Sequence, residues 1–283
     1  MMSGLAPITV ICLTTFVAVT PVAAWNATAH EVIAEIAYRN LSAPVKKEVQ
    51  NMVATLSEEY PYIKSFAQTA AWADQLRSQK VEYFTHWHYI DIAFSTDGTR
   101  LKNITHTDNA LWALEHLTPV LKNQHANPHE RARALAFFIH IVGDLHQPLH
   151  TVSRLSMDFP SGDRGGNLYS LSEGPANPRN NLHHLWDNGL GLFSIKATAG
   201  NVQKIAGTIM QDFPASGFNG AVKKLDAEIW TAEGLKIARG YVYRTPEHQK
   251  PDVEYIAAGQ ILAEKAVALA GYRLARILNE VLM

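Results

Sequence analysis

The fold of this chain is organised around the stretch HIVGDLHQPLH, residues 140–150. It follows the apolar run ALAFFI, residues 134–139, which predicts a buried helix, so polar side chains within it need a specific partner. His140 and Asp144 are four residues apart and lie on one face of such a helix, a spacing suited to binding one metal ion. The alternative interpretation is that the histidines are hydrogen-bonded core residues.

The end of this stretch separates its histidines. Pro148 cannot continue the helix, so His150 leaves the helical register and is free to serve a second metal ion. His146 follows Asp144 by two residues and should face elsewhere, because it lies about 200° around the helix axis.

Composition describes an ordinary globular protein. The chain has 283 residues, of which 47% are hydrophobic and 18% charged, enough for one large single-core domain or two small ones. A formal net charge of −1 argues against a generally basic protein that coats nucleic acid, although it does not exclude an enzyme with a local cleft for it.

Residues 1–24 predict a cleaved export signal. They carry no charged side chain, contain the apolar run 8–13, and end in Val22-Ala23-Ala24, a small-residue cleavage pattern. An uncleaved membrane anchor is the alternative, but the run is short and ends at Pro21. The one cysteine, Cys12, lies inside the signal, so the mature chain would have no disulfide. We therefore expect a secreted or periplasmic protein that begins at Trp25.

Helical periodicity dominates the rest of the chain and predicts a mainly α protein. Beyond an opening helix from Trp25 and a second one capped by Ser42, we expect helices at 65–78, 107–122, 128–147, 197–212, 218–240 and 250–282. Residues 83–91 look extended, with His86 and His88 on one face, and 168–171 look like a short strand. We interpret the last third, 197–283, as scaffold.

Further candidate ligands lie on either side of the central stretch. His30 follows Trp25, whose free amine and carbonyl would become available after cleavage; otherwise Trp25 is an aromatic plug. Asp74 lies in apolar company, with a salt bridge to Arg77 as its alternative role. His183 and Asp187 repeat the spacing of four. We interpret His184, together with His106, His116, His125 and His129, as not being ligands.

The candidate ligands are Trp25, His30, Asp74, His88, His140, Asp144, His150, His183 and Asp187. This mixture of nitrogen and oxygen donors without thiolate suits zinc, with manganese or iron as substitutes. Nine ligands are enough for three ions, which predicts a group of metals rather than a structural site.

The combined motifs resemble a known family. WNxxxH, WAD, HYID, HxxxDxHQPLH, GGN and NLHxxWD occur in this order over residues 25–187. They closely resemble those of the zinc-dependent single-strand nucleases and 3′-nucleotidases of the mung bean nuclease type, with zinc phospholipase C as a more distant member of the superfamily. The resemblance implies that residues 25–283 form a single-domain, mainly α multi-helix bundle around a trinuclear zinc cleft.

The resemblance also implies roles for individual residues. One zinc would be held by Asp74, His88, His140 and Asp144, a second by Trp25, His30 and the bridging Asp144, and a third by His150, His183 and Asp187. Asp74 would orient the attacking water, while Arg77 and Asn167 would steady the charge on the phosphoryl oxygens. Tyr89 and Asp91 match positions that stack on and hydrogen-bond a nucleobase; their alternative role is ordinary packing and capping.

The implied function is an exported endonuclease and 3′-nucleotidase. It would hydrolyse single-stranded DNA and RNA and 3′-nucleotides, leaving 5′-phosphate and 3′-hydroxyl ends, as a monomer without stable membrane association. A zinc phospholipase C is the alternative enzyme, although phospholipases carry a Glu where this chain has Asp187. A non-enzymatic zinc-binding protein is the alternative of another class, and it would leave Arg77 and Asn167 without an obvious role.

Overall fold

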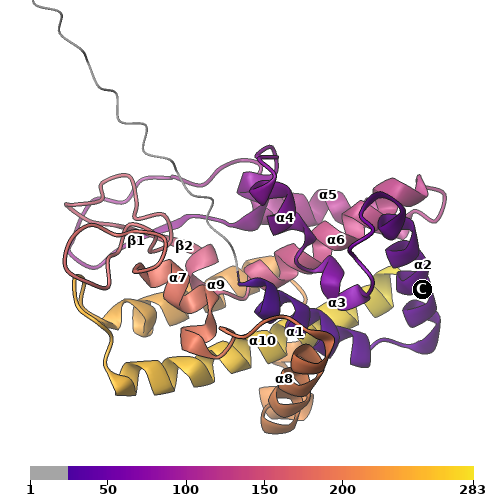
Figure 1. The fold of residues 1–283 in the computed structure, drawn as a ribbon. Coiled ribbons are helices and arrows are strands. Elements are labelled where there is room, and N and C mark those ends of the chain that lie inside the picture. The colour runs from indigo at the N-terminus through magenta and orange to yellow at the C-terminus, as the bar shows by residue number, and fades with distance from the viewer. Residues whose placement is uncertain (1–24) are drawn as a thin grey trace, which may run out of the picture.

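A computed structural model describes residues 25–283 of the chain, and the predicted export signal at 1–24 lies outside the described residues. The described part is mainly helical, as the sequence predicts (Figure 1). Its α-helices are α1 (Ala27–Arg39), α2 (Ala43–Glu59), α3 (Phe66–Thr69), α4 (Trp72–Ser78), α5 (Ala110–Lys122), α6 (Pro128–Asp144), α7 (Leu182–Asp187), α8 (Ala199–Asp212), α9 (Ala227–Gly240) and α10 (Val253–Val281). Two short strands are β1 (Ile92–Ser95) and β2 (Val152–Leu155).

Helix α6 is the centre of the bundle. Asn127 caps its first turn by accepting from the backbone N–H groups of His129 and Glu130, and Pro128 occupies the first position, where no N–H is needed. Helices α2, α4, α5 and α10 pack around it. Because it is enclosed, every residue from 134 to 150 is buried, including the polar ones that the sequence singled out.

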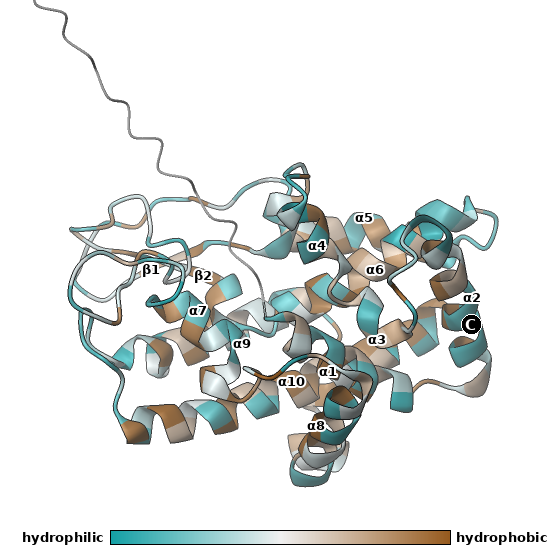
Figure 2. Ribbon diagram, viewed as in Figure 1, coloured by the Kyte–Doolittle hydropathy of each residue, from teal (hydrophilic) through white to brown (hydrophobic). Residues whose placement is uncertain are grey.

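Helices α1 and α10 form the second layer. Helix α10 runs along one side of the molecule in Figure 1 and packs against α1, which also contacts α3 and α8. The two helices approach closely at Gly271, where a Cβ atom would lie 2.6 Å from Ile36. In Figure 2 the ribbon of α10 alternates between hydrophobic and hydrophilic residues, as expected for a helix with one buried face. Within residues 25–283, none of the helices combines the length and apolar character that crossing a membrane requires.

A small parallel sheet connects two of the predicted ligand segments. Strand β1 pairs with β2 in the register Ile92↔Val152, and the backbone N–H of Ile90 donates to the carbonyl of His150. The sheet therefore holds the chain that follows His88 beside the chain that follows His150. Sequence reasoning missed both strands, because four residues are too few for a clear alternating pattern.

Several local predictions were wrong. Residues 85–88 form a 3₁₀ helix, η1 (Thr85–His88), rather than an extended segment, so His88 is buried while His86 stays half-exposed. Packing of Trp87 and Phe84 on Phe137 of α6 replaces the expected alternation. In the segment 168–171, Ser170 alone makes a bridge, to Asn181.

The helix boundaries also differ from those predicted. The helix expected at 65–78 is divided into α3 and α4. Helix α6 ends at Asp144 rather than 147, and Pro148 instead opens a 3₁₀ turn, η2 (Pro148–His150). The segment expected at 218–240 is helical from Ala227, after the 3₁₀ turns η4 (Ala215–Phe218) and η5 (Ala221–Lys223).

Candidate metal centre

The first group of candidate ligands gathers around Asp144, the last residue of α6. Its Oδ2 lies 3.2 Å from His88 Nδ1 and 3.2 Å from His140 Nε2. Its Oδ1 lies 3.2 Å from His30 Nε2. Asp74 Oδ1 lies 3.8 Å from the same two atoms of His88 and His140. The Asp144 carboxylate is thus positioned between two sets of side chains, one on each oxygen.

Four separate elements supply this group. The ligand atoms come from α1 (His30), α4 (Asp74), η1 (His88) and α6 (His140 and Asp144). The rings of His30 and His140 stack with centroids 4.0 Å apart, and His140 Nδ1 donates to the carbonyl of Ala70, which fixes its Nε2 toward Asp144. Residues far apart in the sequence therefore converge because α1 and α4 both pack against α6.

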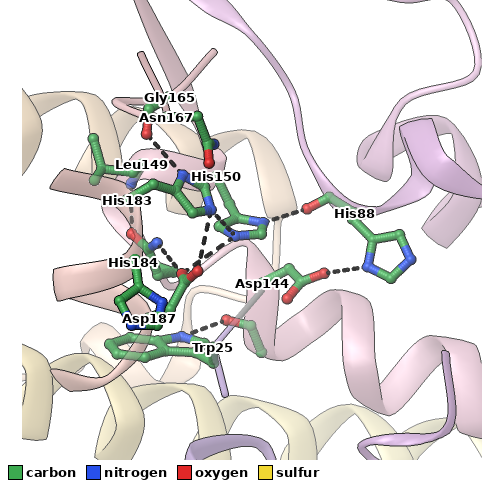
Figure 3. A network of polar contacts seen from close by, with 12 residues as sticks. Trp25, His88, Asp144, Leu149, His150, Gly165, Asn167, His183, His184 and Asp187 are labelled. Carbon is green, nitrogen blue, oxygen red and sulfur yellow. Dashed lines mark hydrogen bonds and ion pairs between the residues drawn. The ribbon is translucent and has the colours of Figure 1, made fainter. Parts of the chain in front are cut away.

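The second group consists of His150, His183 and Asp187, and Figure 3 shows the three side chains pointing toward one another. The Nδ1 atoms of His150 and His183 donate to the carbonyls of His88 and Gly165. Both Nε2 atoms are therefore lone-pair acceptors in the neutral rings, yet they lie 3.1 Å apart. Two acceptors at this distance repel unless a proton or a metal ion lies between them, and this arrangement fits a cation.

Orphaned polar atoms support the same conclusion for the first group. Buried atoms with no hydrogen-bond partner in the described residues include both ring nitrogens of His30, His88 Nε2, Asp74 Oδ1 and Asp144 Oδ1. Three of these atoms, His30 Nε2, Asp74 Oδ1 and Asp144 Oδ1, face other candidate ligand atoms. A buried polar atom without a partner costs about 1–3 kcal/mol, so these three call for a ligand. Imidazoles and carboxylates without thiolate form a donor set that fits zinc.

The electrostatics of the two groups are strongly coupled. Burial alone would raise the pKa of Asp144, but the His140 and His150 imidazoles hold it well below its usual value. Although burial opposes it, the carboxylates of Asp144 and Asp74 raise the pKa of His140 to about 9. Burial raises the pKa of Asp187 well above its usual value. The negative charge of the buried carboxylates is compensated only when protons or cations are bound among these side chains. A metal ion that binds there would displace the protons.

Trp25 lies against the end of α6. Its side chain is fully buried, and the indole N–H donates to the carbonyl of Gly143, one residue before Asp144 (Figure 3). The next residue, Asn26, donates its backbone N–H to the carbonyl of Asp187. The first described residues are thus attached to both ligand groups. The side chain does act as the aromatic plug considered above, and ligation through the Trp25 main chain stays a prediction.

The remaining predicted site residues line a cavity of about 580 Å³ beside the ligands. Its lining includes Arg77, Tyr89, Asp91 and Asn167, as well as His150 and His183. Arg77 Nη1 lies 3.8 Å from Asp74 Oδ1, so the ion pair considered as the alternative role of Asp74 is present together with its place among the ligands. Burial raises the pKa of Asp91 to about 6 and that of Tyr89 to about 12. The structure brings all predicted site residues into one region.

Sequence reasoning missed two fully buried polar residues, one of which holds a ligand. Gln147 is fully buried and donates from Nε2 to Asp187 Oδ1 at 2.7 Å, while its Oε1 accepts from the N–H of Leu149. His146 faces away from the ligands, as predicted, and accepts from Nη1 of the fully buried Arg273 on α10. The signal for Arg273 was a charged residue inside an apolar stripe, so the last third is not purely apolar scaffold.

One further cluster combines histidines that appeared isolated in the sequence. The rings of His86 and His106 stack with centroids 3.6 Å apart, and His86 Nδ1 lies 3.0 Å from Asp108 Oδ1. His106 also lines the cavity. No partner for His106 could be recognised in the sequence, because η1 and the loop before α5 meet only in the folded chain.

A mainly helical bundle with buried groups of imidazoles and carboxylates, beside a cavity lined by an arginine and an asparagine, is consistent with a metal-dependent phosphoesterase. The S1/P1 Nuclease family model matches residues 25–283, and the chain belongs to this family. This confirms the resemblance inferred from the motifs and the expected class of enzyme, a nuclease-type hydrolase.

Three nucleases are similar in sequence to this chain over nearly its whole length. Endonuclease 1 of Arabidopsis thaliana is 26% identical, over 93% of this chain and 88% of its own. Nuclease S1 of Aspergillus oryzae is 25% identical, over 90% of this chain and 91% of its own. Endonuclease 2 of Arabidopsis thaliana is 26% identical, over 91% and 90%.

Proposed function

We propose that the chain is an exported zinc-dependent endonuclease and 3′-nucleotidase. It acts on single-stranded DNA and RNA and on 3′-nucleotides. The observation that carries the proposal is the pair of buried ligand groups, centred on Asp144 and on His150, His183 and Asp187. The second group contributes His150 and His183 to the wall of a cavity that Arg77 and Asn167 also line. Membership of the S1/P1 nuclease family supports the choice of a phosphoester substrate.

Three zinc ions would be distributed over the nine candidate ligands. The first would be held by Asp74, His88, His140 and Asp144, the second by Trp25, His30 and Asp144, and the third by His150, His183 and Asp187. When bound, zinc supplies an acidified water as nucleophile and neutralises charge on the reacting phosphate.

The residues of the cavity bind and orient the phosphate. The Arg77 guanidinium offers several donors to the phosphoryl oxygens. Asn167 already donates one amide hydrogen to the carbonyl of Arg164, which fixes its side chain and leaves a second hydrogen for the substrate. Asp74, beside both His88 and Arg77, orients the attacking water. The water oxygen bonds to phosphorus as the bond to the 3′ oxygen breaks, and the proton that the water loses is taken up by the 3′ oxygen, which leaves a 5′-phosphate and a 3′-hydroxyl.

The opposite end of the cavity receives a base. The Tyr89 ring provides a stacking surface, and the half-buried Asp91, with its pKa raised to about 6, offers a hydrogen bond to the base edge. A base in a duplex is already stacked and paired, so this subsite favours an unpaired strand. Stacking has little sequence preference, which suits a nuclease that degrades any single strand.

The test compares substrates with and without a chelator. The zinc-loaded protein is incubated with single-stranded DNA, duplex DNA, 3′-AMP and phosphatidylcholine, and phosphate or fragment release is measured. We expect chelator-sensitive cleavage of single-stranded DNA and of 3′-AMP, with duplex DNA much slower. Release of phosphocholine alone would instead indicate a phospholipase C, and zinc binding without any hydrolysis would indicate a non-enzymatic protein. Asp144→Asn should abolish cleavage, whereas Asn123→Asp, on the far loop after α5, should not.

A further inference from the structure

Arg164 occupies an unusual position in the wall of the cavity. It lies in the glycine-rich loop that follows β2, and its backbone φ is +56°. This left-handed conformation is strained for a residue with a Cβ atom. The glycines at 162, 165 and 166 also have positive φ, so the chain places glycine at the other such positions of this loop but not here. An arginine kept in a conformation that favours glycine indicates a use for its side chain.

The loop holds Arg164 rigidly in place. The buried Asp163 carboxylate accepts from the N–H of Arg154 and from the hydroxyl of Tyr243. The N–H of Arg164 donates to Ser153 Oγ, and its carbonyl accepts from both the backbone and the side chain of Asn167. The backbone on both sides of Arg164 is therefore fixed, and the guanidinium is presented to the cavity that Asn167 also lines.

The Arg164 guanidinium forms no ion pair within the described residues. The neighbouring Arg154 pairs with Asp163 and Glu247, but within residues 25–283 no carboxylate lies within ion-pair distance of Arg164. Arg164 lines the same cavity as Tyr89 and Asp91, the two residues that would bind the base. An exposed guanidinium without a carboxylate, beside a substrate cavity, is suited to binding an anion in bidentate fashion.

We propose that Arg164 binds a second phosphate of the substrate, on the 5′ side of the nucleoside whose base lies against Tyr89. This inference rests on the proposed function. Arg77 and Asn167 serve the reacting 3′ phosphate, and Arg164 is a further cation that lines the same cavity as Tyr89 and Asp91. The phosphate that it binds belongs to the 5′ carbon of that nucleoside. A strand has this phosphate at every internal nucleoside and a 3′-mononucleotide lacks it, so Arg164 favours strands over mononucleotides.

Two small substrates that differ by this phosphate test the proposal. The zinc-loaded enzyme is assayed with 3′-AMP and with adenosine 3′,5′-bisphosphate, and the ratio of their kcat/KM values is measured at low and at moderate salt. For the wild type we expect a ratio of about ten in favour of the bisphosphate, mainly through KM, corresponding to about 1.4 kcal/mol. The preference should decrease with salt, because an exposed ion pair is screened.

The variant Arg164→Gly should lower this ratio to about one. Glycine suits the backbone at this position, so the melting temperature should not fall, and misfolding cannot account for the loss. Arg164→Lys should keep part of the preference through its charge alone. Arg179→Gln is the matched control, since Arg179 is an exposed loop arginine that does not line the cavity, and it should leave the ratio unchanged.

Three results would overturn the assignment. A wild-type enzyme that hydrolyses both substrates equally well has no second phosphate subsite, and an unchanged ratio in Arg164→Gly places the subsite elsewhere. A variant that changes the preference between 3′-AMP and 3′-GMP instead would show that Arg164 reads the base edge. Failure of the proposed function is distinguishable, because the wild type would then release no phosphate from 3′-AMP at all.

Discussion

Asp144 is the residue on which the candidate centre depends. A carboxylate with both oxygens facing imidazoles, and no exposed surface, is destabilising unless a cation compensates it. The sequence placed Asp144 and His140 on one helical face, and the structure confirms that spacing. The structure also shows that His30, from another helix, lies beside the second carboxylate oxygen of Asp144.

The predicted cleavage before Trp25 has a direct test. If the α-amine of Trp25 is a metal ligand, one extra residue before it converts the amine into a peptide nitrogen, which binds zinc poorly. We expect such an extension to lower the zinc content by about one ion per chain and to reduce activity about tenfold or more.

Zinc per chain is measured by atomic emission, with the same residue added after Met283 as the control. Equal zinc content in the two extended proteins would refute the ligand role of the amine. The buried Trp25 indole, which packs edge-on against Phe193, would then serve packing alone.

Glu31 gives a prediction for pH. It lies on α1, and burial raises its pKa to about 7. Between its unfolded value and about pH 7 the unfolded chain releases a proton that the folded chain retains, so stability falls as pH rises through this window. Glu31→Gln should therefore be more stable than the wild type at pH 8, by about 1–3 kcal/mol.

The difference should shrink toward pH 5, where folded wild-type protein keeps Glu31 neutral. Urea unfolding of both proteins at the two pH values measures it, with Glu254→Gln, exposed in the first turn of α10, as the control. A constant difference between pH 5 and pH 8 would mean that Glu31 ionises normally.

At the scale of elements, the contact of α1 with α6 determines whether His30 reaches Asp144. Gly143 makes this approach possible, because a Cβ atom there would lie 2.8 Å from His30 Nδ1 and 3.4 Å from Ile33. The two helices carry ligands that are more than a hundred residues apart. Because Gly143 of α6 has no side chain, His30 of α1 can reach Asp144.

Gly143→Ala should displace the His30 ring. We expect a loss of about 1–3 kcal/mol in stability from overpacking and weaker binding of one zinc ion. Gly207→Ala is the matched control within α8, where the nearest atom to the added Cβ is the flexible end of Arg39 at 3.4 Å. There the better helix propensity of alanine should give a gain of about 0.5–1 kcal/mol. Differential scanning calorimetry and zinc titration measure both effects, and a Gly143→Ala protein with normal zinc affinity would contradict this account.

At the scale of the whole molecule, metal binding and folding are coupled. Helices α1, α4, α6 and α7 meet through ligand side chains, and within the described residues no cysteine is present to join them covalently. Any ion bound to the folded chain alone stabilises it, by about 4 kcal/mol at a thousandfold excess over its Kd.

Chelation should therefore lower the melting temperature by several degrees for each ion removed. Scanning calorimetry of the zinc-loaded and chelated protein measures the shift, and added zinc should restore the original value. Asp144→Ala, with fewer ions to lose, should show a smaller shift than the wild type. Identical melting curves with and without chelator would indicate that the ligand groups do not hold metal in the folded state.

The sequence by itself determined the helical class and the candidate ligands, because helical periodicity and residue spacing are local properties of the chain. His140 with Asp144 and His183 with Asp187 were placed correctly, since each pair lies on one helix. The local sequence pattern predicted the wrong structure where packing against a distant helix decides the backbone conformation. Residues 85–88 of the segment predicted to be extended form the 3₁₀ helix η1, because aromatic packing on α6 outweighs the alternation.

Only the tertiary structure decided which ligands share a site and what supports them. Three contacts join segments that are distant in the sequence. They are the contact of Asp144 with His30, the hydrogen bond from Gln147 to Asp187, and the hydrogen bond from the buried Arg273 to His146. Such contacts arise when helices pack into one core, and no spacing rule within a single element encodes them. The stretch at 140–150 therefore specified the chemistry, while the packing of α1, α4 and α10 around it specified the geometry.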